Sequence, residues 1–181
     1  GLSWVLSLNT PGVADTATLT KTVSGNVGGG VGIELVLPEV ASAAHSWSMA
    51  AAAGDRVVEF VEPSTDAGVA STTWNYTTRT LVVVTDSSTS IAQGSQVVLR
   101  IRDLTTPSSV VDAAYTVTVT TYSTSTPDST KIIDGPTSIT GAATVAGALT
   151  GGSWDMETDR PGEVSRLDVS FRTTGELKAA S

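Results

Sequence analysis

The chain has 181 residues, of which 40% are hydrophobic, so it is long enough to bury a core, and we expect one domain with an extension. Its formal net charge of −8 opposes binding to nucleic acid and to anionic lipid, because both are negatively charged. It has no cysteine, which excludes disulfides, thiolate nucleophiles and sulfur-ligated metals.

Alternating apolar and polar residues predict many short strands. Over 31–37 the odd positions are apolar, and over 115–120 Tyr115, Val117 and Val119 share one face while threonines cover the other. Clusters of turn-forming residues separate these strands from further ones expected at 2–8, 16–24, 56–61, 72–77, 80–85, 96–102 and 131–133. The pattern predicts an all-β fold, with two antiparallel sheets packed as a sandwich.

The segment from Pro38 to Gly54 leaves two alternatives open. Its apolar residues follow helical spacing, which is compatible with a short helix. His45, Trp47 and Met49 also alternate with serines, as they would in a strand. We favour a strand or an irregular loop, because predicted strands lie on both sides.

The opening of the chain returns near its end at an ungapped offset of 150 residues. The recurring residues are Gly1, Ser3, Trp4, Pro11, Gly12 and Gly25, which return as Gly151, Ser153, Trp154, Pro161, Gly162 and Gly175. This spacing has the size of a domain, so we expect one complete repeat and the start of a second. The predicted division is a β-sandwich repeat over 1–136, a linker or edge strand over 137–152, and the start of a second repeat, or exchanged strands, over 153–181.

Two stretches of the chain carry a family resemblance. The first combines 17–20 with 30–38, and the second combines 91–101 with 104–109 and 115–121. Together they resemble the tandem immunoglobulin-like β-sandwich repeats of large secreted or cell-surface proteins of bacteria and unicellular algae. The resemblance spans roughly residues 12 to 122 and implies an extracellular or cell-surface location in a stalk, coat, filament or adhesin. It supplies no functional side chains.

Catalytic and cofactor-binding motifs are missing from the sequence. A hydrolase triad needs a histidine beside its serine, and His45, the only histidine, is accompanied by no Gly-x-Ser-x-Gly motif. The glycines of 28–32 precede a predicted strand, whereas a phosphate-binding loop would precede a helix, so we interpret them as a turn. We therefore expect no enzyme activity, no catalytic residue and no cofactor.

One acidic run has the spacing of a metal site. Asp155, Glu157 and Asp159 alternate, which on a strand would place three carboxylates on one face, where a hard cation such as calcium binds. The equivalent positions of the first copy carry no acidic residue. We favour a solvated acidic face and expect no metal site.

Aromatic residues and a sequon suggest contacts with sugars. Trp4 and Trp154 occupy one position of the repeat, as buried core or interdomain packing residues would, whereas Trp74 and Tyr76 are weak candidates for sugar contact. Asn75 begins an Asn-Tyr-Thr acceptor sequence for N-glycosylation. The Ser/Thr-rich stretch 120–130 is either a site of O-linked sugar or a polar loop.

The C-terminal segment is too apolar to stay solvated, so we expect it to pack on a neighbouring repeat. Its expected assembly contacts are Trp154, Met156, Val164, Leu167, Val169 and Phe171. No apolar run approaches the roughly 20 residues of a membrane span. The sequence begins at Gly1 with no export signal, so we expect a processed or excised piece.

These observations together predict a function. We expect an extracellular structural repeat of a surface layer, fibre or adhesive protein that assembles head to tail through its terminal strands. Its partners would be neighbouring copies of the same repeat, and glycans. The alternative is a carbohydrate-binding module or an accessory domain of a secreted enzyme.

Overall fold

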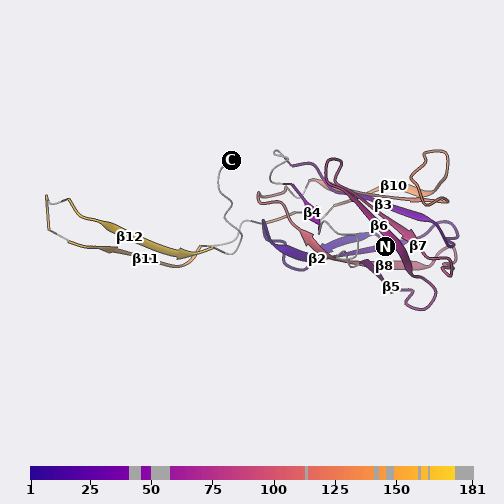
Figure 1. Cartoon of the computed structure of the whole chain (residues 1–181), viewed down its shortest axis with the longest axis horizontal. Coiled ribbons are helices and arrows are strands. Elements are labelled where there is room, and N and C mark those ends of the chain that lie inside the picture. The colour runs from indigo at the N-terminus through magenta and orange to yellow at the C-terminus, as the bar shows by residue number, and fades with distance from the viewer. Residues whose placement is uncertain are drawn as a thin grey trace.

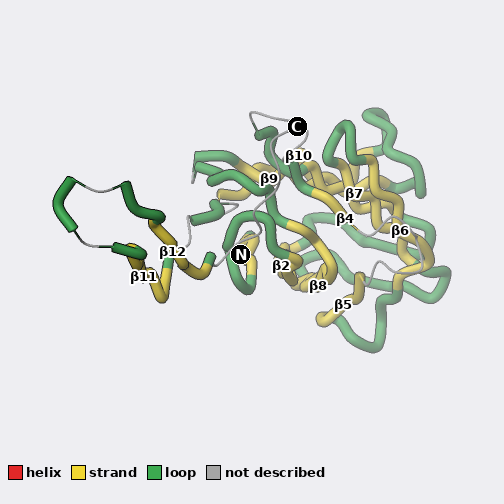
Figure 2. Tube along the Cα trace, turned by 60° about the vertical axis from the view of Figure 1, so that its left-hand side comes forward, coloured by secondary structure: helices red, strands yellow, loops and turns green. Residues whose placement is uncertain are grey.

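The structure is a computed structural model that describes residues 1–40, 46–49, 58–112, 114–140, 143–145, 149–158, 160–162 and 164–173. Within these ranges it contains no helix, and every pair of neighbouring strands is antiparallel. The strands form two five-stranded sheets and one separate two-stranded sheet. The prediction of an all-β, antiparallel fold is confirmed (Figures 1 and 2).

The first sheet combines strands from the N-terminal part of the chain with strands from its middle. It follows the order β1 (Ser3–Leu6), β2 (Ala14–Thr22), β8 (Gln96–Thr105) and β4 (Ser48–Met49), and β5 (Val58–Glu62) also pairs with β8. The strand β8 is therefore the centre of this sheet. One edge of β8 pairs with β2, and its other edge pairs with β4 and β5.

The second sheet follows the order β10 (Ile132–Thr140), β9 (Thr116–Tyr122), β3 (Gly32–Val36), β7 (Thr80–Thr85) and β6 (Val69–Asn75). Its inward side chains and those of the first sheet form one apolar core, as in a β-sandwich. Val83, Val117 and Val119 of the second sheet and Ala17 and Leu99 of the first are completely buried. The alternation of apolar and polar residues in the sequence predicts these inward positions, because successive side chains of a strand point to opposite sides.

Most predicted strands are present, with shifted ends. The strand expected at 80–85 coincides with β7, and that expected at 16–24 is β2, which begins two residues earlier. In the ambiguous segment, Ser48–Met49 form β4, while 41–45 and 50–57 lie outside the described residues. The strand expected at 131–133 is longer, since β10 continues through Gly135 and Pro136 to Thr140 and pairs with β9 at the edge of the sheet.

The separate two-stranded sheet consists of β11 (Thr150–Met156) and β12 (Leu167–Arg172). Figure 1 shows this hairpin extending away from the sandwich at one end of the molecule. Before it, Thr144 forms a bridge with Val111, and the backbone N–H of Val145 donates to the carbonyl oxygen of Asn9 at 2.8 Å. The sandwich therefore extends at least to residue 145.

The phase of β9 gives a direct test of this packing. Val117 is completely buried, whereas the neighbouring Thr118 is only partly buried on the opposite face. Val117→Asp should lower the free energy of unfolding by several kcal/mol, because a carboxylate would be buried without a partner. Thr118→Asp should cost about 1 kcal/mol or less, the range of strand propensities. Urea denaturation measures both, and equal losses would contradict the observed strand phase.

Candidate assembly site

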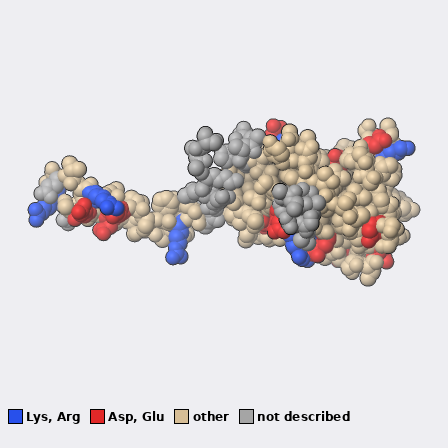
Figure 3. Space-filling model, in the orientation of Figure 1, with Lys and Arg blue, Asp and Glu red and all other residues tan. Residues whose placement is uncertain are grey.

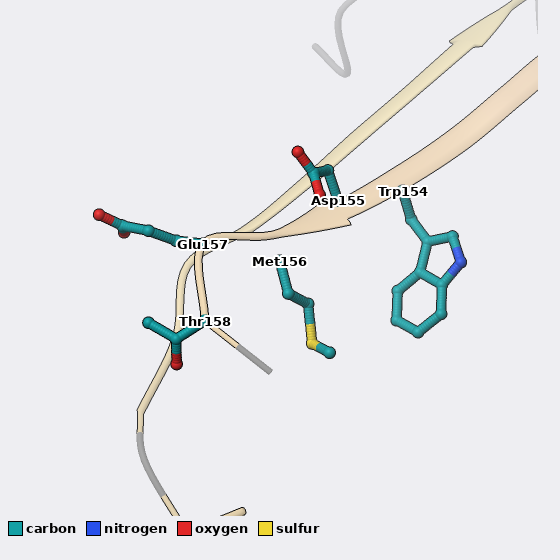
Figure 4. A pocket seen from close by; sticks show the side chains of 5 residues that line it. All are labelled: Trp154, Asp155, Met156, Glu157 and Thr158. Carbon is teal, nitrogen blue, oxygen red and sulfur yellow. The ribbon is translucent and has the colours of Figure 1, made fainter. Parts of the chain in front are cut away.

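The hairpin β11–β12 collects its apolar side chains on one face. Trp154 lies opposite Val169 and Met156 lies opposite Leu167, with Asp155 between them in sequence. Since side chains alternate along a strand, these four residues share a face and Asp155 takes the other. Figure 4 shows Trp154 and Met156 pointing to one side of β11 and Asp155 to the other.

This apolar face is open to solvent. All six predicted assembly contacts are exposed, with exposed fractions of 68% for Trp154, 43% for Met156, 102% for Val164, 50% for Leu167, 60% for Val169 and 49% for Phe171. Phe171 lies on the same face as Leu167 and Val169, because the three residues are two apart on β12. Only Val164 lies outside the strands, before β12 begins. The structure thus brings five of the six residues onto one surface.

The register of this hairpin repeats that of β1–β2. In the first hairpin Trp4 faces Leu19, and 150 residues later Trp154 faces Val169. The other shared pairs keep the same offset: Ser3 with Thr20, Val5 with Thr18 and Leu6 with Ala17 correspond to Ser153 with Ser170, Asp155 with Asp168 and Met156 with Leu167. Four consecutive strand pairs therefore match without a shift.

The hydrogen bonds at the ends of the two hairpins also correspond. Ser7 N donates to the carbonyl oxygen of Thr16 at 3.0 Å, and Glu157 N donates to that of Arg166 at 3.0 Å. Both loops contain a glycine with positive φ after a proline, 69° at Gly12 and 84° at Gly162, a conformation that glycine adopts without strain. The two loops thus have the same length and agree in the closing hydrogen bond and in the backbone conformation of this glycine.

A side-chain contact in the loop is kept while its acceptor changes. The carboxylate of Asp15 accepts hydrogen bonds from the backbone N–H of Leu8, at 3.1 Å for the nearer oxygen. At the offset positions, Thr158 N donates to the hydroxyl oxygen of Ser165 at 2.9 Å. A polar acceptor at this position holds the loop in both hairpins.

The two hairpins differ in what covers them. Trp4 is 3% exposed and its partner Leu19 is 1% exposed, because β2 pairs with β8 and the second sheet covers their apolar face. Among the described strands β12 pairs only with β11. The expected burial is therefore found for Trp4. No second layer covers Trp154 in the described part of the chain, so its packing on a neighbouring repeat stays a prediction.

The two aromatic residues expected to contact sugar differ in burial. Trp74 is partly buried and packs against the core, where it lines an interior space together with Trp4 and Met49. Tyr76 follows the end of β6 and is 67% exposed. Tyr76 is therefore accessible to a ligand and Trp74 only in part, and sugar contact by this pair stays a prediction.

The predicted glycosylation residue is accessible. Asn75 is the exposed last residue of β6, and its side-chain carbonyl oxygen accepts hydrogen bonds from Thr77 N at 3.0 Å and Thr78 N at 3.2 Å. These bonds form an Asx turn at the tip of the β6–β7 hairpin.

The remaining candidates from the sequence show no assembled site. His45 and Asp159 lie outside the described residues. The described residues contain no group of three His, Cys, Asp or Glu side chains placed to hold a metal. Gly29 and Gly30 form a turn just before β3, and at Gly29 a Cβ would come within 2.8 Å of the backbone oxygens of Asp86 and Ser87. A close approach of two backbones accounts for this glycine.

Sequence reasoning missed one buried ion pair between the sheets. Lys21 of β2 lies 3.6 Å from Asp134 of β10, and its ammonium group donates a hydrogen bond to the hydroxyl of Thr121 at 3.0 Å. Burial lowers the pKa of Lys21, and the attraction of Asp134 opposes that shift. Asp134 also accepts a hydrogen bond from Ser24 N at 2.9 Å. No motif in the sequence relates these distant residues.

Comparison of the chain with models of protein families, with curated proteins and with solved structures finds no match. In the part of the chain that the structure describes, no helix has the length and apolar character needed to cross a membrane.

The ion pair generates a prediction about stability. Lys21→Met should lower the free energy of unfolding by about 3 kcal/mol, because it leaves Asp134 charged and buried without its partner. The matched control is Lys131→Met, which removes the exposed lysine just before β10. That change should stay within about 0.5 kcal/mol. If urea denaturation shows equal effects for the two variants, Lys21 is not paired in the interior.

Proposed function

We propose that this chain is an extracellular structural repeat of a surface layer, fibre or adhesive protein, in which immunoglobulin-like units are joined head to tail through their terminal strands. The observation that carries the proposal is the hairpin β11–β12. It repeats the register of β1–β2 while leaving its apolar face open. A hairpin of this kind is the first part of a unit whose remaining strands must come from elsewhere.

Energetics support a partner for this hairpin. An isolated two-stranded sheet is only marginally stable in water. Five large apolar side chains on one face form a contiguous exposed patch, which in proteins marks a contact surface. Covering such a face with another unit would join the two units mechanically.

The surface of the sandwich fits a structural role. Strands such as β2, β6 and β9 present threonines outward, and Figure 3 shows that the visible face of the sandwich is largely uncharged. Asn75 stands at a hairpin tip, where a glycan would meet solvent rather than a neighbouring strand. These features support an extracellular location for the proposed repeat.

The test of assembly compares the full chain with residues 1–149. This truncation removes β11 and β12 and keeps Thr144 and Val145, which contact the sandwich. Analytical ultracentrifugation should show the full chain associating as its concentration rises and the truncated chain remaining a monomer. Both should have the same melting temperature, because the hairpin is not part of the first core.

Matched variants separate the apolar face from the hairpin as a whole. Trp154→Ser combined with Val169→Ser should abolish the association, whereas Asp155→Ser, on the opposite face, should preserve it. A full chain that stays monomeric at every concentration and melts much higher than its truncated form would contradict the proposal. In that case the hairpin would belong to its own sandwich.

A further inference from the structure

We infer that the edge of β12 to which no described strand is paired is a docking site for an antiparallel strand of the β8 type, and that a sheet like β3 and β7 then covers the apolar face of the hairpin. This inference rests on the proposed function, which makes β11–β12 the beginning of the next unit. It adds the identity, direction and register of the strand that the hairpin receives.

The first unit provides the template for the docking. Its strand β2 has β1 on one edge and β8 on the other, with Leu19 opposite Leu99 and Ala17 opposite Ile101. Both partners of each pair are buried. Since β11 already reproduces β1 on one edge of β12, the other edge corresponds to the one that β8 occupies.

Transferring that register by 150 residues gives complementary contacts. Leu167 and Val169 would face the isoleucine and leucine of a β8-type strand, in place of Ala17 and Leu19. All of these side chains are apolar and would be directed into the new core. The exposed face of the hairpin thus has the composition that the template needs.

The outer face adds a charge match that the first unit lacks. In β8, Arg100 lies opposite Thr18, and its guanidinium group is 2.8 Å from the carboxylate of Glu59. The residue at the position of Thr18 in the second hairpin is Asp168. An arginine on the incoming strand would therefore lie across from a carboxylate, which favours this register over a shifted one.

Phe171 predicts one residue in which the second unit must differ from the first. The counterpart of Lys21 is Phe171, so the Lys21–Asp134 ion pair cannot form again. An aspartate brought to the position of Asp134 would be buried against an aromatic ring without a cation, which is costly. The strand that plays the part of β10 beside Phe171 therefore carries an uncharged residue there.

The test supplies the missing strands from the chain itself. Residues 26–149 are appended directly after Gly175, the counterpart of Gly25, so that 151–175 and the added residues make one unit. Hydrogen exchange of the β11 and β12 amides, followed by mass spectrometry, should slow by about 100-fold or more relative to the natural chain. Unchanged exchange in the hairpin would overturn the inference.

Two variants of the extended chain test the register. Leu167→Asp, on the apolar face, should abolish the protection of the hairpin while the first unit stays protected, whereas Asp155→Ser, on the outer face, should retain it. Phe171→Lys should increase the protection at least about tenfold, because it pairs with the Asp134 of the added copy. A decrease with Phe171→Lys would contradict the proposed alignment.

The hydrogen-exchange experiment can fail or succeed independently of the assembly experiment. If the natural chain is monomeric but the extended chain protects its hairpin, head-to-tail association of separate molecules fails and the β8-type docking stands. If the natural chain associates and its hairpin is already as protected as in the extended chain, the hairpin is covered by another hairpin, and the β8-type docking is overturned.

Discussion

A β-hairpin with one apolar face is stable in water only when a second layer covers that face, and this constraint governs both hairpins of the chain. For β1–β2 the cover is complete, since β8 extends the sheet and the second sheet lies over its apolar face. For β11–β12 the same arrangement of strands is present without the cover. The contrast between Trp4, 3% exposed, and Trp154, 68% exposed, follows from this difference alone.

The central position of β8 explains why the hairpin β1–β2 is stably packed in the sandwich. This ten-residue strand pairs with β2 along one edge and with β4 and β5 along the other. Its inward residues, Leu99 and Ile101 among them, are almost completely buried. A unit that contains equivalents of β1 and β2 but none of β8 lacks the longest strand pairing of the sheet. It also lacks the buried side chains that β8 contributes to the core. This is why we assign such a strand to the edge of β12 to which no described strand is paired.

The sequence predicts a large part of this fold because alternation and repetition are visible in the order of residues alone. Period-2 patterns locate most strands, and the 150-residue offset relates Trp4 to Trp154. Partners far apart in sequence carry no such signal: the Lys21–Asp134 pair depends on β2 of the first sheet meeting β10, the edge strand of the second. Trp74 also shows the limit of local reasoning. Its alternation with Asn75 was readable, but only the packing shows that its ring faces the core.

The account depends most directly on the two hairpins having one register in solution. Because the backbone bonds from Ser7 to Thr16 and from Glu157 to Arg166 correspond, the pairs Trp4–Leu19 and Trp154–Val169 are both of the non-hydrogen-bonded kind, which brings their Cα atoms closest. Nuclear Overhauser measurements on the full chain should then detect Hα–Hα contacts between Trp154 and Val169 and between Met156 and Leu167, as between Trp4 and Leu19. Contacts shifted to another register in β11–β12, or absent there while those of β1–β2 are present, would contradict the account.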